Sequence, residues 1–146
     1  MILWRHAEAA DGVPDDARPL TEKGRRQAER MAHFLSGRIP KNTRVLVSPA
    51  LRAQQTASAL SKHFTIEPKV GTRATAKTAL TASGWPGTGG AVLLVGHQPW
   101  LGELAALVMT GETNSWNIKK GAVWWFSHDE DADQTTLRLV IAPDQV

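Results

Sequence analysis

The feature that most constrains the fold of this chain is an apolar run, Ala-Val-Leu-Leu-Val, at residues 91–95, followed directly by Gly96 and His97. Five residues are too few for a helix, and apolar character without alternation indicates a strand that is buried on both faces. Strands of this kind occur in parallel sheets that are covered by helices on each side. The run therefore predicts a central parallel strand and an α/β fold.

The rest of the chain alternates between strand and helix patterns. Strands are expected at residues 2–4, 44–47, 66–70, 122–126 and 137–141, and helices after Thr21, from Ser48 and Pro49, within 72–83 and after Pro99. An acidic turn at 129–133 predicts that the last two strands form an antiparallel hairpin at the sheet edge. The repeated order predicts a three-layer sandwich, a mostly parallel sheet flanked by helices, in a single domain spanning residues 1–146.

The composition narrows the class of protein. Of the 146 residues, 42% are hydrophobic and 21% charged, no cysteine is present, and the net charge is only +3. The lysines and arginines are scattered, whereas a nucleic-acid binder usually carries a basic stripe. No apolar run approaches the roughly 18 residues of a membrane span. We therefore expect a cytoplasmic protein that binds neither nucleic acid nor membrane.

Three polar segments follow predicted parallel strands: residues 5–8 (Arg-His-Ala-Glu), 48–52 (Ser-Pro-Ala-Leu-Arg) and 96–99 (Gly-His-Gln-Pro). In open α/β sheets, ligands bind beyond the carboxyl ends of the strands. The last two segments also open helices, whose N-termini favour anions. The three segments are therefore expected to form one anion-binding site.

The charged groups of these segments suit a phosphoryl group. Arg5 and Arg52 offer planar guanidinium forks that match phosphate oxygens, and a neutral imidazole at His6 has a lone pair that can attack phosphorus. His97 and the two arginines would stabilise charge on the phosphoryl oxygens during transfer. The expected catalytic set is His6, Arg5, Arg52 and His97, with a covalent phosphohistidine at His6 and with no metal or cofactor.

Three more residues are candidates for the rim of this phosphate pocket: Arg18, Gln98 and Ser48. For Arg18 an equal alternative is an ion pair with Asp15 or Asp16 in the loop after the first strand. Gln98 is as readily a polar residue that starts a helix.

The same motifs resemble those of the histidine phosphatase superfamily, whose fold is shared with cofactor-dependent phosphoglycerate mutase. The family opening Arg-His-Gly is similar to Arg5-His6-Ala7, with alanine in place of glycine. Its second arginine lies in a Ser-x-x-x-Arg-Ala-x-x-Thr pattern, and its second histidine lies in a Gly-His pair, here Gly96-His97. The matching residues of the second motif are Ser48, Arg52, Ala53 and Thr56.

Within that superfamily the chain most resembles the short bacterial phosphohistidine phosphatases of the SixA type. The short length, the Arg-His-Ala-Glu-Ala opening and the Arg-Pro-Leu-Thr sequence at residues 18–21 carry the resemblance. The resemblance implies a phosphoglycerate mutase-like fold and removal of the phosphoryl group from phosphohistidine on a protein, typically a histidine phosphotransfer protein.

A proton donor for an alkoxide leaving group is hard to find. Residues 65–90 hold a single carboxylate, Glu67, and no long insertion. Glu8 is a candidate acid because it lies two residues after His6, although a solvated loop carboxylate is the alternative. The leaving group of phosphohistidine is an imidazole, with a reference pKa of roughly 6.5, and it needs little help from an acid. The absence of a clear proton donor therefore favours phosphohistidine over sugar phosphates as the substrate.

Two other functions stay open at this point. One is a general small-molecule phosphomonoesterase with the same nucleophile, and the other is a non-catalytic module that binds a phosphorylated protein. Lys119 and Lys120 are candidates for docking an acidic partner, and the alternative is that they belong to a solvated loop.

Overall fold

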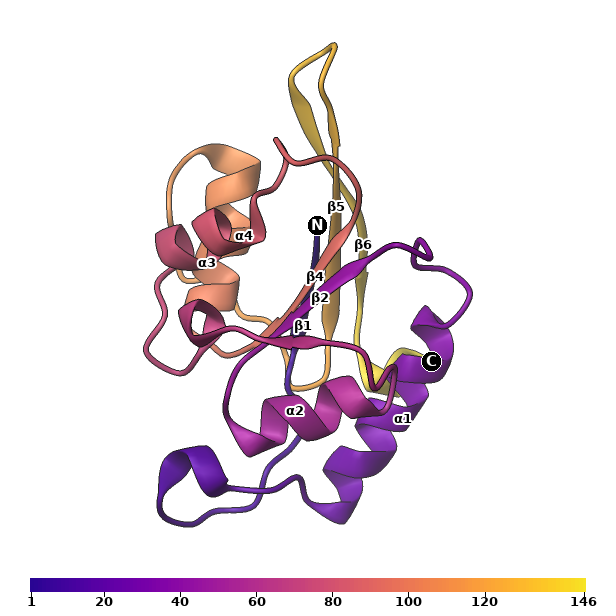
Figure 1. Cartoon of the computed structure of the whole chain (residues 1–146), viewed down its shortest axis with the longest axis vertical. Coiled ribbons are helices and arrows are strands. Elements are labelled where there is room, and N and C mark those ends of the chain that lie inside the picture. The colour runs from indigo at the N-terminus through magenta and orange to yellow at the C-terminus, as the bar shows by residue number, and fades with distance from the viewer.

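The computed structural model describes all 146 residues and contains one six-stranded sheet with the order β3-β2-β4-β1-β5-β6 (Figure 1). The strands are β1 Ile2–Arg5, β2 Arg44–Val47, β3 Thr65–Ile66, β4 Val92–Gly96, β5 Val123–Asp129 and β6 Gln134–Ile141. The α-helices are α1 Glu22–Leu35, α2 Leu51–Ser58, α3 Ala76–Ser83 and α4 Trp100–Thr110. Three short 3₁₀ turns are η1 Asp15–Ala17, η2 Pro68–Val70 and η3 Pro143–Gln145.

Strand β4 lies at the centre of the sheet, as the apolar run predicted. It pairs in parallel with β1 on one side and β2 on the other, and all five of its residues are buried. Strands β5 and β6 form the expected antiparallel hairpin, with β6 at the sheet edge. The prediction of an α/β sandwich with a mostly parallel sheet is confirmed.

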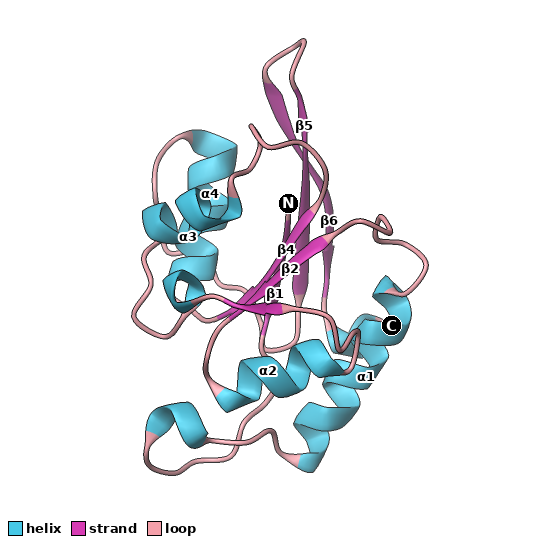
Figure 2. Ribbon diagram, in the orientation of Figure 1, coloured by secondary structure: helices cyan, strands magenta, loops and turns pink.

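The sheet separates two apolar cores because alternate side chains of each strand point to opposite faces. Ile2 and Trp4 of β1 pack with α1 and α2, whereas Leu3 packs with α3 and α4. Figure 2 shows these two pairs of helices on opposite faces of the sheet. None of the helices is long and apolar enough to cross a bilayer.

The first helix starts where the sequence predicts, whereas the second does not. The hydroxyl of Thr21 accepts a hydrogen bond from the Gly24 amide at 2.9 Å and caps α1. Helix α2 begins at Leu51 with Ala50 as its N-cap, so the prediction that Ser48 and Pro49 start it is wrong. The amide of Ser48 still bonds across the sheet, which keeps this residue extended and delays the turn.

The segment predicted as a strand at 66–70 is only partly a strand. Thr65–Ile66 pairs with β2, and the chain then turns into η2 at Pro68, whose missing amide hydrogen cannot continue a ladder. The following helix is shorter than the predicted span of 72–83. It begins at Ala76, where the side chains of Thr75 and Thr78 form a reciprocal cap.

Gly24 gives a test of how α1 packs on the loop that follows β1. A Cβ atom at this position would lie 2.0 Å from the main-chain oxygen of Glu8, which cannot move freely. We expect Gly24→Ala to lower the free energy of unfolding by at least about 2 kcal/mol through overpacking. Urea titration measures this change. Gly87→Ala is the matched control, because its nearest neighbouring atom is 3.9 Å from the added Cβ; equal losses in both variants would contradict the packing argument.

Candidate active site

The carboxyl ends of β1, β2 and β4 bring His6, Ser48 and His97 to one edge of the sheet. The amide of His6 donates to the Gly96 carbonyl, and the amide of Ser48 donates to the Val95 carbonyl, each at 3.1 Å. The sheet hydrogen bonds therefore extend one residue beyond the strands on this edge. This extension fixes the backbone from which the site's side chains project.

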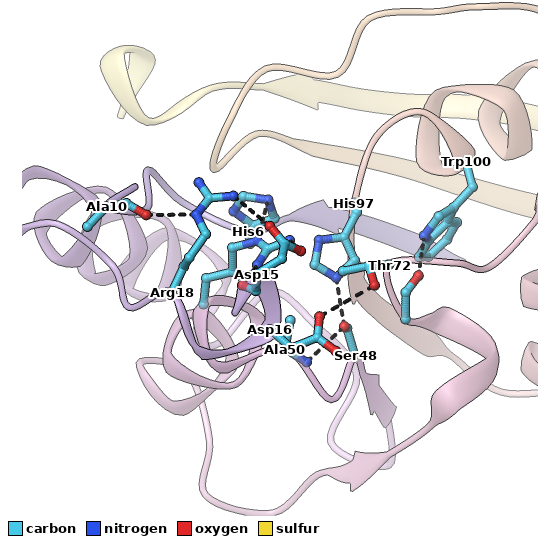
Figure 3. A network of polar contacts seen from close by, with 12 residues as sticks. His6, Ala10, Asp15, Asp16, Arg18, Ser48, Ala50, Thr72, His97 and Trp100 are labelled. Carbon is cyan, nitrogen blue, oxygen red and sulfur yellow. Dashed lines mark hydrogen bonds and ion pairs between the residues drawn. The ribbon is translucent and has the colours of Figure 1, made fainter. Parts of the chain in front are cut away.

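His6, Arg52 and His97 form a compact cluster at this edge. The two imidazole rings have centroids 5.1 Å apart and are tilted by 52°, and Nε of Arg52 lies 3.4 Å from Nε2 of His6. Figure 3 shows the rings of His6 and His97 side by side, with Ser48 below His97. The exposed fractions are 7% for His6, 5% for Arg52 and 3% for His97, so solvent barely screens these groups.

The hydrogen bonds of His6 define which ring nitrogen carries the lone pair. Nδ1 lies 2.7 Å from the Ala7 carbonyl, which can only accept, so we assign the proton to Nδ1. Nε2 then carries the lone pair and faces the guanidinium of Arg52. Burial lowers the pKa of His6 from 6.5 to about 4, the bond to Ala7 opposes this, and the charge of Arg52 lowers it further. His6 is therefore neutral at physiological pH.

His97 is held by Ser48. Its Nε2 lies 2.7 Å from the Ser48 hydroxyl, and that hydroxyl already accepts from the Ala50 amide at 3.1 Å. The hydroxyl hydrogen is thus free to point at Nε2, which leaves the proton of a neutral imidazole on Nδ1. Nδ1 is buried and has no hydrogen-bond partner. Burial, His6 and Arg52 lower the pKa of His97 to about 3.

Thr56, the last residue of the Ser-x-x-x-Arg-Ala-x-x-Thr motif, connects two parts of the site through its hydroxyl. Its hydroxyl accepts from the Ala7 amide at 3.1 Å and donates to the Arg52 carbonyl at 2.8 Å. Ala7, the residue after His6, is thereby tied to the helix that carries Arg52. We infer that Thr56 maintains the spacing between His6 and Arg52.

Arg5 lies beside this cluster but its hydrogen bond goes elsewhere. Its Nη1 donates to the Ile118 carbonyl at 2.7 Å, and its buried Nε has no partner. Partial burial lowers the pKa of Arg5 from its usual value. Arg5 therefore joins the site to the loop that precedes β5 and keeps one donor unused.

The remaining candidates from the sequence lie at or beyond the margin of the cluster. Gln98 binds the Trp116 carbonyl and an amide of α4, so both ends of its side-chain amide are used. The carboxylate of Glu8 accepts from the Thr21 hydroxyl at 2.9 Å and lies 3.6 Å from Nζ of Lys23. The hydrogen bond from Thr21, with help from Lys23, lowers the pKa of Glu8, which does not suit a proton donor.

Sequence reasoning missed the importance of Asp15. Its main-chain oxygen accepts from Nη1 of Arg52 at 2.8 Å, and its Oδ2 pairs with Nη2 at 3.1 Å. Its Oδ1 pairs with Arg18 at 2.9 Å, as one alternative from the sequence expected. Both arginines hold the pKa of Asp15 below its usual value. The Asp-Asp pair at residues 15–16 predicts an ion pair with the nearby Arg18, but no sequence pattern predicts the contact with Arg52.

The loop that carries Asp15 covers the cluster. Arg18 also donates from Nε to the Ala10 carbonyl at 2.8 Å, and Asp16 reaches the hydroxyl of Thr72 at 3.4 Å on the other side (Figure 3). In this arrangement the main-chain carbonyl of Asp15 occupies Nη1 of Arg52 and its carboxylate occupies Nη2, so both groups are taken before an anion arrives.

The geometry suits one kind of ligand. The neutral imidazole of His6, the unpartnered Nδ1 of His97 and the guanidinium of Arg52 lie within one small region. Such an arrangement is chemically suited to bind a tetrahedral oxyanion beside a nitrogen that can act as a nucleophile. No group of three or more His, Cys, Asp or Glu side chains gathers in the way a metal site requires.

Comparison with known proteins supports the same chemistry. Residues 1–74 match the model of the histidine phosphatase superfamily (branch 1). The chain is 33% identical over 126 residues to phosphohistidine phosphatase SixA of Escherichia coli, covering 77% of this chain and 76% of that protein. A structure of the protein histidine phosphatase SixA complexed with tungstate superposes with a TM-score of 0.83 and 28% identity, covering 99% and 98% of the two chains.

More distant structures share the fold alone. A putative α-ribazole-5'-P phosphatase from Escherichia coli aligns with a TM-score of 0.71 at 18% identity, covering 98% of both chains. This similarity extends the likeness to an ester phosphatase in architecture only.

Removing the Asp15 carboxylate should strengthen oxyanion binding. In the structure this carboxylate competes for the Nη2 group of Arg52, and its negative charge repels an incoming anion. We expect Asp15→Ala to bind tungstate several-fold more tightly than the unchanged protein, measured by isothermal titration calorimetry. Asp16→Ala is the control, because its carboxylate contacts Thr72 and no arginine. Weaker binding in Asp15→Ala would show that Asp15 supports Arg52 and does not compete for it.

The buried histidines should make stability depend on pH. Their folded-state pKa values of about 4 and about 3 lie below the reference value of 6.5, so the unfolded chain binds more protons in this window. The free energy of unfolding should therefore be full above pH 6.5 and fall as the pH drops towards 4, since a tenfold difference in proton affinity corresponds to roughly 1.4 kcal/mol. Urea titrations at several pH values measure the slope. A His6→Gln/His97→Gln variant should lose most of it, and an unchanged slope in that variant would contradict the assignment.

Proposed function

Because this chain belongs to the histidine phosphatase superfamily and is a phosphatase of that family, we propose that it hydrolyses phosphohistidine on a protein substrate through a covalent intermediate at His6. The observation that carries the proposal is the lone pair on Nε2 of His6, which faces Nε of Arg52 at 3.4 Å, with both side chains buried. A nucleophilic nitrogen with a cation beside it is what phosphoryl transfer requires.

In the first step, Nε2 of His6 attacks phosphorus while the bond from phosphorus to the substrate nitrogen breaks. The substrate imidazole carries a proton on its other ring nitrogen, so it takes the electron pair of the broken bond and leaves as a neutral imidazole. The phosphoryl group becomes bonded to His6, whose ring keeps its proton on Nδ1 and is now positively charged. In the second step, water attacks the phosphorus of this intermediate, which releases inorganic phosphate and restores the neutral imidazole of His6. The bond from Nδ1 to the Ala7 carbonyl keeps the correct tautomer through both steps.

The other residues hold the phosphoryl oxygens. The proton that we assign to Nδ1 of His97 has no partner in the protein, so a phosphoryl oxygen can accept it. Once Nε2 of His6 bonds to phosphorus, the Nε–H of Arg52 that donated to it can turn to a phosphoryl oxygen, and an Nη group joins it when Asp15 moves aside. Arg5 adds positive charge beside His6. We expect these donors to make a metal ion unnecessary, so activity should persist in the presence of a chelator.

The identity of the leaving group follows from the acids near the site. Glu8 follows His6 by two residues and Asp15 contacts Arg52, and hydrogen bonds lower the pKa of each carboxyl group. Both are therefore anionic at neutral pH and poor proton donors. An imidazole leaves without strong acid assistance, whereas an alkoxide does not. This contrast favours phosphohistidine over alkyl phosphates, in agreement with the activity named for the SixA relatives.

The two alternative functions fit these residues less well. A general phosphomonoesterase needs a proton donor that these residues do not offer. A non-catalytic binding module needs positive charge, but it does not need a nucleophile whose tautomer and pKa are set in this way. We also propose a cytoplasmic location and a role in signal transduction, on the basis of the cysteine-free sequence and the proposed phosphoprotein substrate.

A single set of assays tests the mechanism. The protein is offered a phosphohistidine protein, an aryl phosphate and an alkyl phosphate, with inorganic phosphate release as the readout. We expect hydrolysis of the phosphohistidine protein, weaker hydrolysis of the aryl ester and little of the alkyl ester. His6→Ala should abolish both turnover and the acid-labile phosphoenzyme seen after rapid quenching. Arg52→Ala should lower turnover by roughly 100-fold, as loss of one charge-stabilising donor does elsewhere.

His33→Ala is the matched control, since this histidine lies on the exposed side of α1, away from the site. Wild-type activity in His6→Ala would rule out the covalent mechanism. A preference for the alkyl ester would instead support the phosphomonoesterase.

A further inference from the structure

We propose that a basic groove beside the active site docks an acidic segment of the phosphorylated protein, an inference that rests on the proposed function. The groove consists of a hollow of about 460 Å³ and a second hollow of about 210 Å³ that share Lys23 and Asp144. Six basic residues line the groove: Arg5, Lys23, Arg26, Arg30, Lys119 and Lys120. Only two acidic residues do, Glu8 and Asp144.

The groove is tied to the catalytic strand by main-chain hydrogen bonds. The amide of Gly121 donates to the carbonyls of both Arg5 and His6 at 3.1 Å, and Nε1 of Trp4 donates to the Gly121 carbonyl at 3.1 Å. The side chain of Arg5 binds the Ile118 carbonyl, and Ile118 is fully buried. Lys119 and Lys120 lie between these anchors, so their position relative to His6 is fixed by the fold.

The opposite wall of the groove is also held in place. Helix α1 supplies Lys23, Arg26 and Arg30, and the segment at residues 142–144 lies against it, as Figure 1 shows for the C-terminal end of the chain. Arg5 lines the groove and directly precedes His6, and the Gly121 amide bonds to the carbonyls of both residues, so one rigid stretch of backbone carries the groove wall and His6. In the proposed complex, a protein chain whose phosphohistidine reaches His6 passes its neighbouring residues over the groove.

The charges of the groove are largely uncompensated. Lys23 lies 3.6 Å from Glu8, and Arg26 pairs with Glu22 at 2.7 Å. Lys119, Lys120 and Arg30 form no ion pair in the structure, and all three are exposed. They remain available for aspartate and glutamate side chains of a partner, and attraction of this kind speeds encounter and orients the complex.

An acidic protein segment fits the groove better than a nucleic acid does. No aromatic side chain lines either hollow, so a base would find no surface for stacking. Glu8 and Asp144 would repel a continuous phosphate backbone, whereas separate carboxylates can pair with individual lysines. The groove therefore complements a polypeptide that carries a few acidic side chains near its phosphohistidine.

The test uses two synthetic phosphohistidine peptides of equal length, one flanked by glutamates and one by glutamines, together with free phosphohistidine. For the unchanged protein we expect kcat/KM to be about five- to twentyfold higher for the glutamate peptide, with an advantage that shrinks as salt is added. The Lys119→Glu/Lys120→Glu variant should lose this preference. Its activity on the glutamine peptide and on free phosphohistidine should stay unchanged, because neither lysine contacts the phosphoryl site.

A variant with the same change in net charge controls for long-range effects. Lys41→Glu/Lys62→Glu places the reversals before β2 and β3, at the opposite end of the parallel strands, and should keep the preference. Equal loss of preference in both double variants, or no loss in either, would overturn the inference.

A binding assay separates this inference from the proposed function. Fluorescence anisotropy with the unphosphorylated glutamate peptide reports on the groove without any turnover. If no substrate is hydrolysed but the peptide binds the unchanged protein and not the Lys119→Glu/Lys120→Glu variant, the groove is supported while the proposed activity fails. Tighter binding of a labelled single-stranded oligonucleotide than of the peptide would overturn the choice of partner.

Discussion

The close approach of Arg52 to His6 determines much of the rest of the site. A guanidinium 3.4 Å from an imidazole nitrogen, with both groups almost fully buried, is tolerable only while the imidazole is neutral and turns its lone pair towards the cation. The Ala7 carbonyl meets this condition by holding the proton on the other ring nitrogen. Burial also keeps the imidazole of His6 neutral, because it disfavours a second positive charge beside Arg52. The same condition keeps His6 in the neutral form that the proposed nucleophilic role requires.

The positive charge of Arg52 in turn explains two features further out. His97 cannot carry a proton on both nitrogens beside it, so its single proton must be directed, and the Ser48 hydroxyl directs it towards Nδ1. Arg52 itself needs a counter-charge, which Asp15 provides from the covering loop. A buried guanidinium without a partner would cost several kcal/mol, so a carboxylate that can exchange with a phosphoryl group stabilises the ligand-free site.

Features of the fold and the site that depend on neighbouring residues in the sequence could be predicted, whereas features that depend on tertiary contacts could not. The apolar run before Gly96 and the cap at Thr21 are local, and both predictions are confirmed. Ser48 carried a local capping signal too. In the structure, however, its amide bonds to the Val95 carbonyl of the sheet and its hydroxyl contacts His97, and α2 starts later, at Leu51. For Asp15 the local signal predicted only the pairing with Arg18 and not the contact with Arg52. Its role arises only when a loop folds over a helix that begins much later in the chain, at Leu51.

The covering carboxylate and the basic groove act over different distances, and together they bear on selectivity. At contact distance Asp15 neutralises part of the charge on Arg52 and Arg18, so a free anion must displace an existing ion pair before it binds. At longer distance the uncompensated lysines of the groove attract acidic surfaces irrespective of what occupies the pocket. A small phosphate therefore has to displace Asp15 from Arg52 and gains no attraction from the groove in return. A phosphorylated acidic protein is held by the groove first, which raises the local concentration of its phosphoryl group at the pocket and offsets the cost of moving Asp15.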